Sequence, residues 1–124
     1  MSTFIKEPTL TSLAVSLDSN AGTLFFEGRS LPENSTAFFK PILDWVEDYA
    51  KSTTKKTECS FRLEYFNSSS RKCIVDILRI IDALHKKERN VNVTWNYDEG
   101  DENMKETGEE YEALFSIPFK FVAY

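Results

Sequence analysis

The stretch CSFRLEYFNSSSRKCIVDIL, residues 59–78, decides the fold of this chain. Apolar and polar side chains alternate through residues 59–66, and this alternation predicts a half-buried β-strand. One asparagine and three serines then make a tight polar turn. From Cys73 the apolar side chains recur every three or four residues, which predicts an amphipathic helix to about Lys87. The stretch therefore predicts a strand, a turn and a helix in direct succession, as in an α/β domain.

The residues before this stretch predict a hairpin and a helix. Residues 11–17 alternate between apolar and small polar side chains, and residues 23–28 are rich in β-branched and aromatic types, so we predict two antiparallel strands. Asn34 or Ser35 is placed to cap a helix. Its aromatic and aliphatic side chains recur at helical spacing as far as about Ser52.

The residues after the stretch predict a strand, a short helix and a last strand. These elements are expected over residues 91–97, 104–115 and 117–124. The buried positions expected on the short helix are Tyr111, Leu114 and Phe115.

The order of these elements predicts an α/β (α+β) architecture. Two strands followed by alternating helices and strands suit a mixed five-stranded sheet with about three helices, mainly on one face. That arrangement is similar to STAS-like regulators. We expect residues 1–124 to form a single regulatory domain, with residues 1–10 as an irregular N-terminal segment.

Charge and hydropathy restrict the partners of the chain. Its formal net charge is −5, which opposes binding to nucleic-acid phosphates, so we expect protein partners and no nucleic acid. No apolar run approaches the roughly 20 residues that span a bilayer, and the first residues do not have the order of a signal peptide. We therefore expect a cytoplasmic protein without membrane insertion. Its two cysteines, Cys59 and Cys73, are expected to be reduced and buried.

Catalytic motifs are missing from the sequence. It has no nucleophile elbow, no P-loop and no dinucleotide-binding glycine pattern, and its one histidine, His85, lacks a second ligand to share a metal. Residues 98–112 hold eight carboxylates against one lysine, but their spacing differs from that of a calcium loop. A solvated acidic face is the favoured interpretation, and an enzyme with a metal bound there is the least favoured alternative. We predict no enzyme activity, no cofactor and no metal.

The serine turn is the most informative feature for function. A strand delivers three hydroxyls to a helix N-terminus, where free backbone N–H groups and the helix dipole favour negative charge. A phosphate on Ser68 or Ser69 is therefore compatible with the site, and Arg71 and Lys72 would help to neutralise it. The alternative interpretation is that the serines cap the helix and fill the turn, which is the most frequent use of serine in such positions.

Three longer segments resemble a known family. They are GRSLPENSTAFFKPILDWVEDY at residues 28–49, FRLEYFNSSSRKCIVDIL at residues 61–78 and VNVTWNYDEGDENMKETGEEY at residues 91–111. Together they resemble the SiaC family of bacterial regulatory phosphoproteins, and the resemblance covers nearly the whole chain from about residue 11.

The resemblance implies a site of phosphorylation. The family pattern usually reads YFNTSSSK, and its threonine is phosphorylated by a dedicated kinase of the SiaB type and dephosphorylated by a PP2C-type phosphatase. Ser68 occupies that position here and retains the hydroxyl; Ser69 and Ser70 are less favoured sites. Arg71 replaces a usual serine, a second departure that affects how a phosphate would be paired.

The resemblance also implies the partner. The unphosphorylated form is expected to bind and activate a diguanylate cyclase, and so to influence cyclic di-GMP synthesis and biofilm formation, whereas phosphorylation breaks that contact. We expect a monomer or weak dimer. An alternative is a constitutive STAS-like scaffold without phosphorylation, in which the acidic face selects the partner. The residues expected to contact the partner are Leu31, Pro32, Glu33, Asn34, Tyr65, Asn67, Ser69, Arg71 and Lys72.

Overall fold

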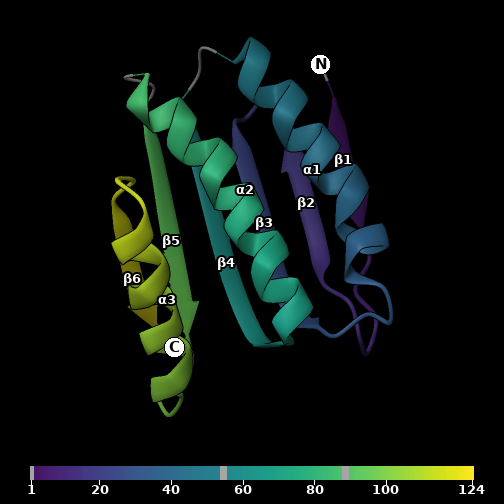
Figure 1. Ribbon diagram of the computed structural model, residues 1–124, viewed down its shortest axis with the longest axis vertical. Coiled ribbons are helices and arrows are strands. Elements are labelled where there is room, and N and C mark those ends of the chain that lie inside the picture. The colour runs from purple at the N-terminus through teal and green to yellow at the C-terminus, as the bar shows by residue number, and fades with distance from the viewer. Residues whose placement is uncertain (1, 54–55, 88–89) are drawn as a thin grey trace.

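The computed structural model describes residues 2–53, 56–87 and 90–124, and in these residues a six-stranded mixed sheet carries three helices on one face (Figure 1). The strands and helices alternate from the third strand onward. Their bounds are β1 Thr3–Lys6, β2 Ala14–Asp18, β3 Thr23–Ser30, α1 Ser35–Ser52, β4 Thr57–Phe66, α2 Ser68–Lys86, β5 Val91–Tyr97, α3 Glu102–Leu114 and β6 Phe119–Ala123.

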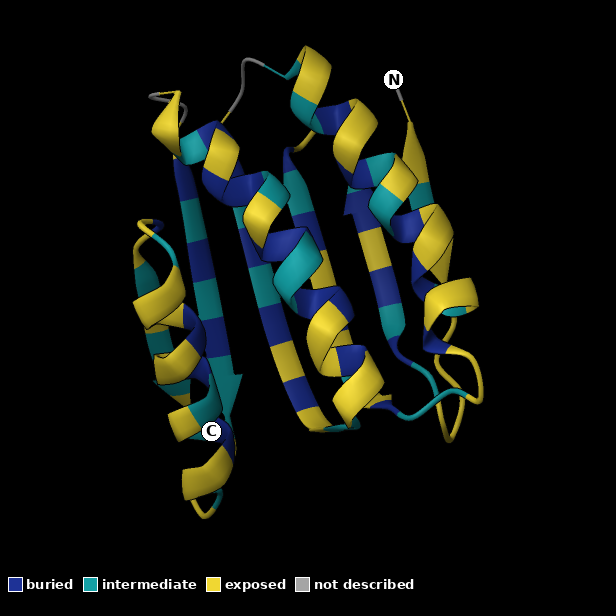
Figure 2. Cartoon of the chain, viewed as in Figure 1, coloured by how far each residue is buried: buried dark blue, intermediate teal, exposed yellow. Residues whose placement is uncertain are grey.

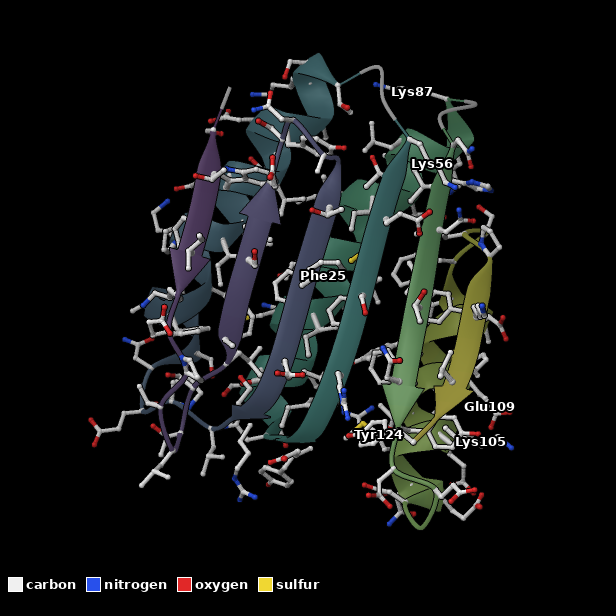
Figure 3. All side chains as sticks on the ribbon, turned by 180° about the vertical axis from the view of Figure 1, so that it is seen from behind. Phe25, Lys56, Lys87, Lys105, Glu109 and Tyr124 are labelled. Carbon is white, nitrogen blue, oxygen red and sulfur yellow. The ribbon has the colours of Figure 1, made fainter. Side chains whose placement is uncertain are left out.

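The strands lie in the sheet in the same order as in the sequence. β1, β2 and β3 are antiparallel neighbours, and β3 to β6 are all parallel. Connections between parallel strands are right-handed, so a sheet with strands in sequence order places every crossover helix on the same face. In the described part of the chain, the opposite face carries no helix (Figure 3). The prediction of helices mainly on one face is therefore confirmed.

The core lies between the sheet and the helices. Along the strands, residues that point toward the helices are buried and alternate with more exposed residues, which point to the other face. The banded strands of Figure 2 show this alternation. Three aromatic rings make the centre of the sheet's buried face: Phe61 stacks on Phe26 at 5.0 Å between centroids and lies 5.5 Å from Trp95. Burial of aromatic side chains of this size is a main source of stability in such a domain.

The N-terminal segment differs from the prediction. Residues 1–10 were expected to be irregular, but residues 3–6 form β1 and pair with β2, for instance Phe4 with Leu17. This strand makes the sheet six-stranded, where five strands were predicted. Only Phe4 of its four residues is even half-buried, so the strand has no clear alternation of burial that would reveal it in the sequence.

The buried face of α3 also differs in part from the prediction. Tyr111 is buried as expected, but Leu114 is 64% exposed, and the other buried positions are Met104 and Gly108. The reason is a close approach: a Cβ at Gly108 would overlap the Trp95 ring, so the helix presents its smallest residue to the sheet. A pattern of apolar side chains cannot identify a glycine as a contact position.

Candidate functional site

The serine turn lies where two parallel strands end side by side. Ser30, the last residue of β3, is in register with Phe66, the last residue of β4. The chain leaves both strands at the same edge of the sheet, and the Asn67 N–H donates to the Ser30 carbonyl at 2.9 Å. The loop of residues 31–34 and the serine turn are therefore neighbours, although more than 30 residues separate them in the sequence.

Two helix N-termini meet at this edge (Figure 1). The Asn34 side chain accepts a hydrogen bond from the Ala37 N–H at 3.0 Å and caps α1, and the Asn67 side chain accepts one from the Ser70 N–H at 2.9 Å and caps α2. The interpretation of Asn34 as a cap is confirmed. The positive ends of two helix dipoles thus lie next to each other, which favours negative charge in this region.

A buried network of hydroxyls joins the two helix starts. Ser70 and Ser30 are fully buried, and their Oγ atoms are 2.8 Å apart. Ser35, the first residue of α1, lies 3.3 Å from the Ser70 Oγ and 2.7 Å from the Ser69 Oγ. Ser70 is therefore a structural residue whose hydroxyl the folded chain does not present to an enzyme.

The two exposed serines of the turn are not equivalent. The Ser69 Oγ donates to the Asn67 side chain at 3.1 Å in addition to its contact with Ser35, so it is engaged on both sides. Ser68 is exposed at the first position of α2, and within the described part of the chain its hydroxyl has no hydrogen-bond partner. Among the three serines, Ser68 is the one whose hydroxyl can react without breaking a contact.

Arg71 connects the serine turn to α3. Its Nη1 lies 3.5 Å from the Glu110 carboxylate, and its guanidinium lies 5.6 Å from the centre of the Phe66 ring and 6.0 Å from that of Tyr111. The Tyr111 hydroxyl donates to the Arg71 carbonyl at 3.2 Å. Burial raises the pKa of Tyr111 above its usual range, which the Arg71 charge only partly offsets, so this hydroxyl stays protonated.

The other residues expected to contact a partner are spread around this edge. Leu31 and Pro32 are half-buried, Glu33 and Lys72 are exposed, and Tyr65 is 48% exposed with the Arg29 guanidinium 5.8 Å from its ring centre. Asn67 is half-buried as the cap of α2. The structure thus brings the loop of residues 31–34 and the serine turn together on one edge.

Ser30 and Ser35 are the residues that sequence reasoning missed in this site. The sequence predicts Ser35 only as a possible cap for α1 and predicts no role for Ser30. The sequence does contain a signal for Ser30. Every second residue of β3 points toward the core, and Ser30 follows the buried Phe26 by four residues and Gly28 by two, so it occupies an inward-facing position. A serine at such a position needs a polar partner, because a buried hydroxyl without one is costly.

The remaining chemistry-bearing groups do not form a second site in the described residues. Burial raises the pKa of Cys59 and of Cys73, so neither thiol has the character of a nucleophile. Within residues 2–53, 56–87 and 90–124, no three His, Cys, Asp or Glu side chains are grouped so that they could hold a metal ion. None of the helices in these residues has the length and apolar character needed to cross a membrane.

An exposed serine at a helix N-terminus, with its hydroxyl free of contacts in the described residues, is compatible with a regulatory protein controlled by phosphorylation. The comparison with family models agrees. The model for the SiaC family regulatory phosphoprotein matches residues 6–124, and this chain belongs to that family.

Several relatives come from Pseudomonas aeruginosa. An uncharacterized protein of strain UCBPP-PA14 is 36% identical over 116 residues, which cover 94% of this chain and 92% of the relative. The solved structure of SiaC of Pseudomonas aeruginosa superposes with a TM-score of 0.93 at 35% identity and covers 100% of both chains. A crystal structure of the diguanylate cyclase SiaD in complex with its activator SiaC gives the same TM-score and identity over 98% of this chain and 99% of that one.

Proposed function

We propose that this chain, in its unphosphorylated form, binds and activates a diguanylate cyclase, and that phosphorylation of Ser68 ends the contact. The observation that carries the proposal is the exposed and unengaged hydroxyl of Ser68 at the start of α2. Membership of a family of regulatory phosphoproteins supports the switch. The similar SiaC found in complex with the cyclase SiaD, as its activator, supports the partner.

The position of Ser68 suits a reversible charge. A phosphoryl group adds about −1.5 to −2 charges at neutral pH, and the N-terminus of a helix tolerates such a charge through its dipole and free N–H groups. The modification therefore need not unfold α2. The phosphoryl group instead changes the charge of the surface around the serine turn, which a partner can contact.

The expected consequence for the partner is loss of affinity. A dianion placed within a packed interface loses its hydration and repels any acidic group that faces it. Such a change can cost several kcal/mol of binding free energy, because the packed interface does not replace the hydration that the charge loses. The loop of residues 31–34 lies beside the turn and would share this surface.

Two enzymes would operate the switch. A kinase of the SiaB type would transfer the phosphoryl group to the Ser68 Oγ, and a PP2C-type phosphatase would hydrolyse the ester, which restores the hydroxyl and releases inorganic phosphate. The chain itself would supply the substrate serine and the cyclase-binding surface, with no reaction of its own.

Intact-mass measurement with site mapping tests the phosphorylation. The protein is purified from its native host beside Ser68→Ala and Ser69→Ala variants, and a phosphoryl group adds about 80 Da. We expect the added mass on Ser68, retained in Ser69→Ala and lost in Ser68→Ala. Phosphate that persists in Ser68→Ala would overturn the assignment to Ser68, and no phosphate in the unmodified sequence under several growth conditions would favour the constitutive scaffold.

A further inference from the structure

Arg71 is held one helical turn away from Ser68. Residues three apart on a helix are neighbours, with about 5–6 Å between their Cβ atoms. In the unmodified chain the guanidinium is engaged elsewhere: it pairs with Glu110 of α3 and packs near the Phe66 and Tyr111 rings. A cation is therefore kept close to the proposed phosphorylation site by contacts that do not involve Ser68.

The pair between Arg71 and Glu110 is weak. Its N to O distance is 3.5 Å, at the long end for a hydrogen bond, and the two side chains are 47% and 68% exposed. Exposed ion pairs of this kind contribute little because water screens both charges. A stronger acceptor within reach of the guanidinium would displace the Glu110 carboxylate.

Two hydrogen bonds hold the backbone of Arg71, whereas its side chain is 47% exposed and, within the described residues, makes only the weak ion pair and the ring contacts. The Arg71 N–H donates to the Asn67 carbonyl at 3.0 Å, and the Arg71 carbonyl accepts from the buried Tyr111 at 3.2 Å. The start of the side chain therefore stays in place. Rotation of its outer part is enough to move the guanidinium from α3 toward the first turn of α2.

A phosphate on Ser68 is such an acceptor. It carries more charge than a carboxylate and offers three oxygens, and a planar guanidinium binds two of them at once. Lys72 is the rival cation, because it lies four residues from Ser68 and has no ion pair in the described part of the chain. Its ammonium offers one point of contact and has no aromatic ring among the described contacts to hold it nearby.

We propose that Arg71 receives the phosphate of phosphorylated Ser68 and releases Glu110 in the exchange. This inference rests on the proposed phosphorylation of Ser68. The modification then alters two elements together: it places a paired phosphate at the start of α2, and it leaves an unpaired carboxylate on α3. The net charge of the surface across both helices changes only by that of the phosphate, but part of the unpaired negative charge now lies on α3.

Phosphorus-31 NMR of a chain with phosphoserine built in at position 68 during translation tests the exchange. The second pKa of the phosphate, near 6 in the free amino acid, is read from its chemical shift during a pH titration. Arg71→Gln should raise this pKa by about half a pH unit, because a close cation favours the dianion. Lys72→Gln removes the same charge and should raise it much less. Glu110→Gln should lower it, since Arg71 loses its competing partner.

Equal rises in Arg71→Gln and Lys72→Gln, or a larger rise in Lys72→Gln, would overturn the assignment of Arg71. An unchanged phosphate pKa in Glu110→Gln would overturn the exchange. Circular dichroism of each variant checks that the helix content is unchanged. The phosphoserine is installed without a kinase or a cyclase, so the two proposals are tested separately. If the NMR titration contradicts the role of Arg71, the proposed function still stands. If the host does not phosphorylate Ser68, the NMR result is still valid.

Discussion

Ser68 and Ser70 have the same side chain, and their surroundings give them opposite roles. The Ser70 hydroxyl is fully buried against Ser30, and its loss would leave that buried hydroxyl short of a partner. The Ser68 hydroxyl faces water, so its loss removes no contact within the described residues. At the scale of single residues, the turn therefore separates a buried structural serine from an exposed one.

The two serines should differ in their effect on stability. Ser70→Ala should lower the free energy of unfolding by about 1–3 kcal/mol, the usual cost of a buried group left without its hydrogen bond. Ser68→Ala should change it by less than about 0.5 kcal/mol, as at most exposed positions. Urea denaturation followed by circular dichroism measures both. A loss in Ser68→Ala as large as that in Ser70→Ala would contradict the assignment of their roles.

At the scale of elements, α3 is positioned by two specific contacts. Gly108 lets the helix approach Trp95, whose indole N–H donates to the Met104 carbonyl at 2.9 Å. At its other end, the buried Asp82 of α2 accepts hydrogen bonds from the backbone and side chain of Ser116, at 2.9 and 3.0 Å. These contacts place Glu110 opposite Arg71.

Gly108→Ala should destabilise the protein, although alanine is the better helix former. Helix propensity alone predicts a gain of about 1 kcal/mol, whereas the overlap with Trp95 predicts a net loss of about 1–3 kcal/mol. Ala113→Gly, on the exposed side of the same helix, is the control and should lose about 1 kcal/mol from propensity. Urea denaturation followed by tryptophan fluorescence gives both values. A stabilised Gly108→Ala would show that α3 does not approach Trp95 this closely.

The stability contributed by Asp82 should depend on pH. Burial raises the pKa of Asp82, but the hydrogen bonds from Ser116 and the charge of Lys86, 3.3 Å away, outweigh this and lower it overall. Because the folded pKa lies below the unfolded value of about 3.9, the contribution is present above that pH and is lost as pH falls through the folded pKa.

Asp82→Asn should therefore be less stable than the unmodified chain at pH 7, by about 1–3 kcal/mol, and the difference should shrink below about pH 4. Asp44→Asn is a matched control: Asp44 pairs with Lys40 at 3.2 Å at the same spacing, but both side chains are exposed, and the expected loss is below about 0.5 kcal/mol. Urea denaturation at several pH values measures both. A difference for Asp82→Asn that grows as pH falls would contradict the sign of the pKa shift.

At the scale of the whole molecule, the sequence predicts the parts of the fold that have a regular pattern. β5 has the predicted bounds, and α1 ends at Ser52 as predicted, because their apolar spacing is unbroken. β1 could not be found in this way, since three of its four residues are exposed. The predicted burial of Leu114 was wrong, because Gly108 determines which face of α3 contacts the sheet. A hydropathy pattern does not mark a glycine as a contact residue.

The candidate site could be predicted only in part from the sequence. The serine turn follows from local chemistry, and so does the positive end of α2. The contact of Ser35 with Ser69 depends on β3 and β4 ending together, a consequence of parallel pairing that local patterns do not encode. The resemblance to the family already favours Ser68 over Ser69 and Ser70, and the fold adds the information that the hydroxyls of Ser69 and Ser70 are engaged.

For the molecule as a whole, we propose that one phosphate on Ser68 controls the contact with a cyclase. The most direct test is isothermal titration of the host's SiaD-type diguanylate cyclase with the unmodified chain and with the chain carrying phosphoserine at position 68. We expect the unmodified chain to bind and the phosphate to weaken binding at least about 100-fold, equivalent to about 3 kcal/mol. Equal affinities of the two forms would contradict it.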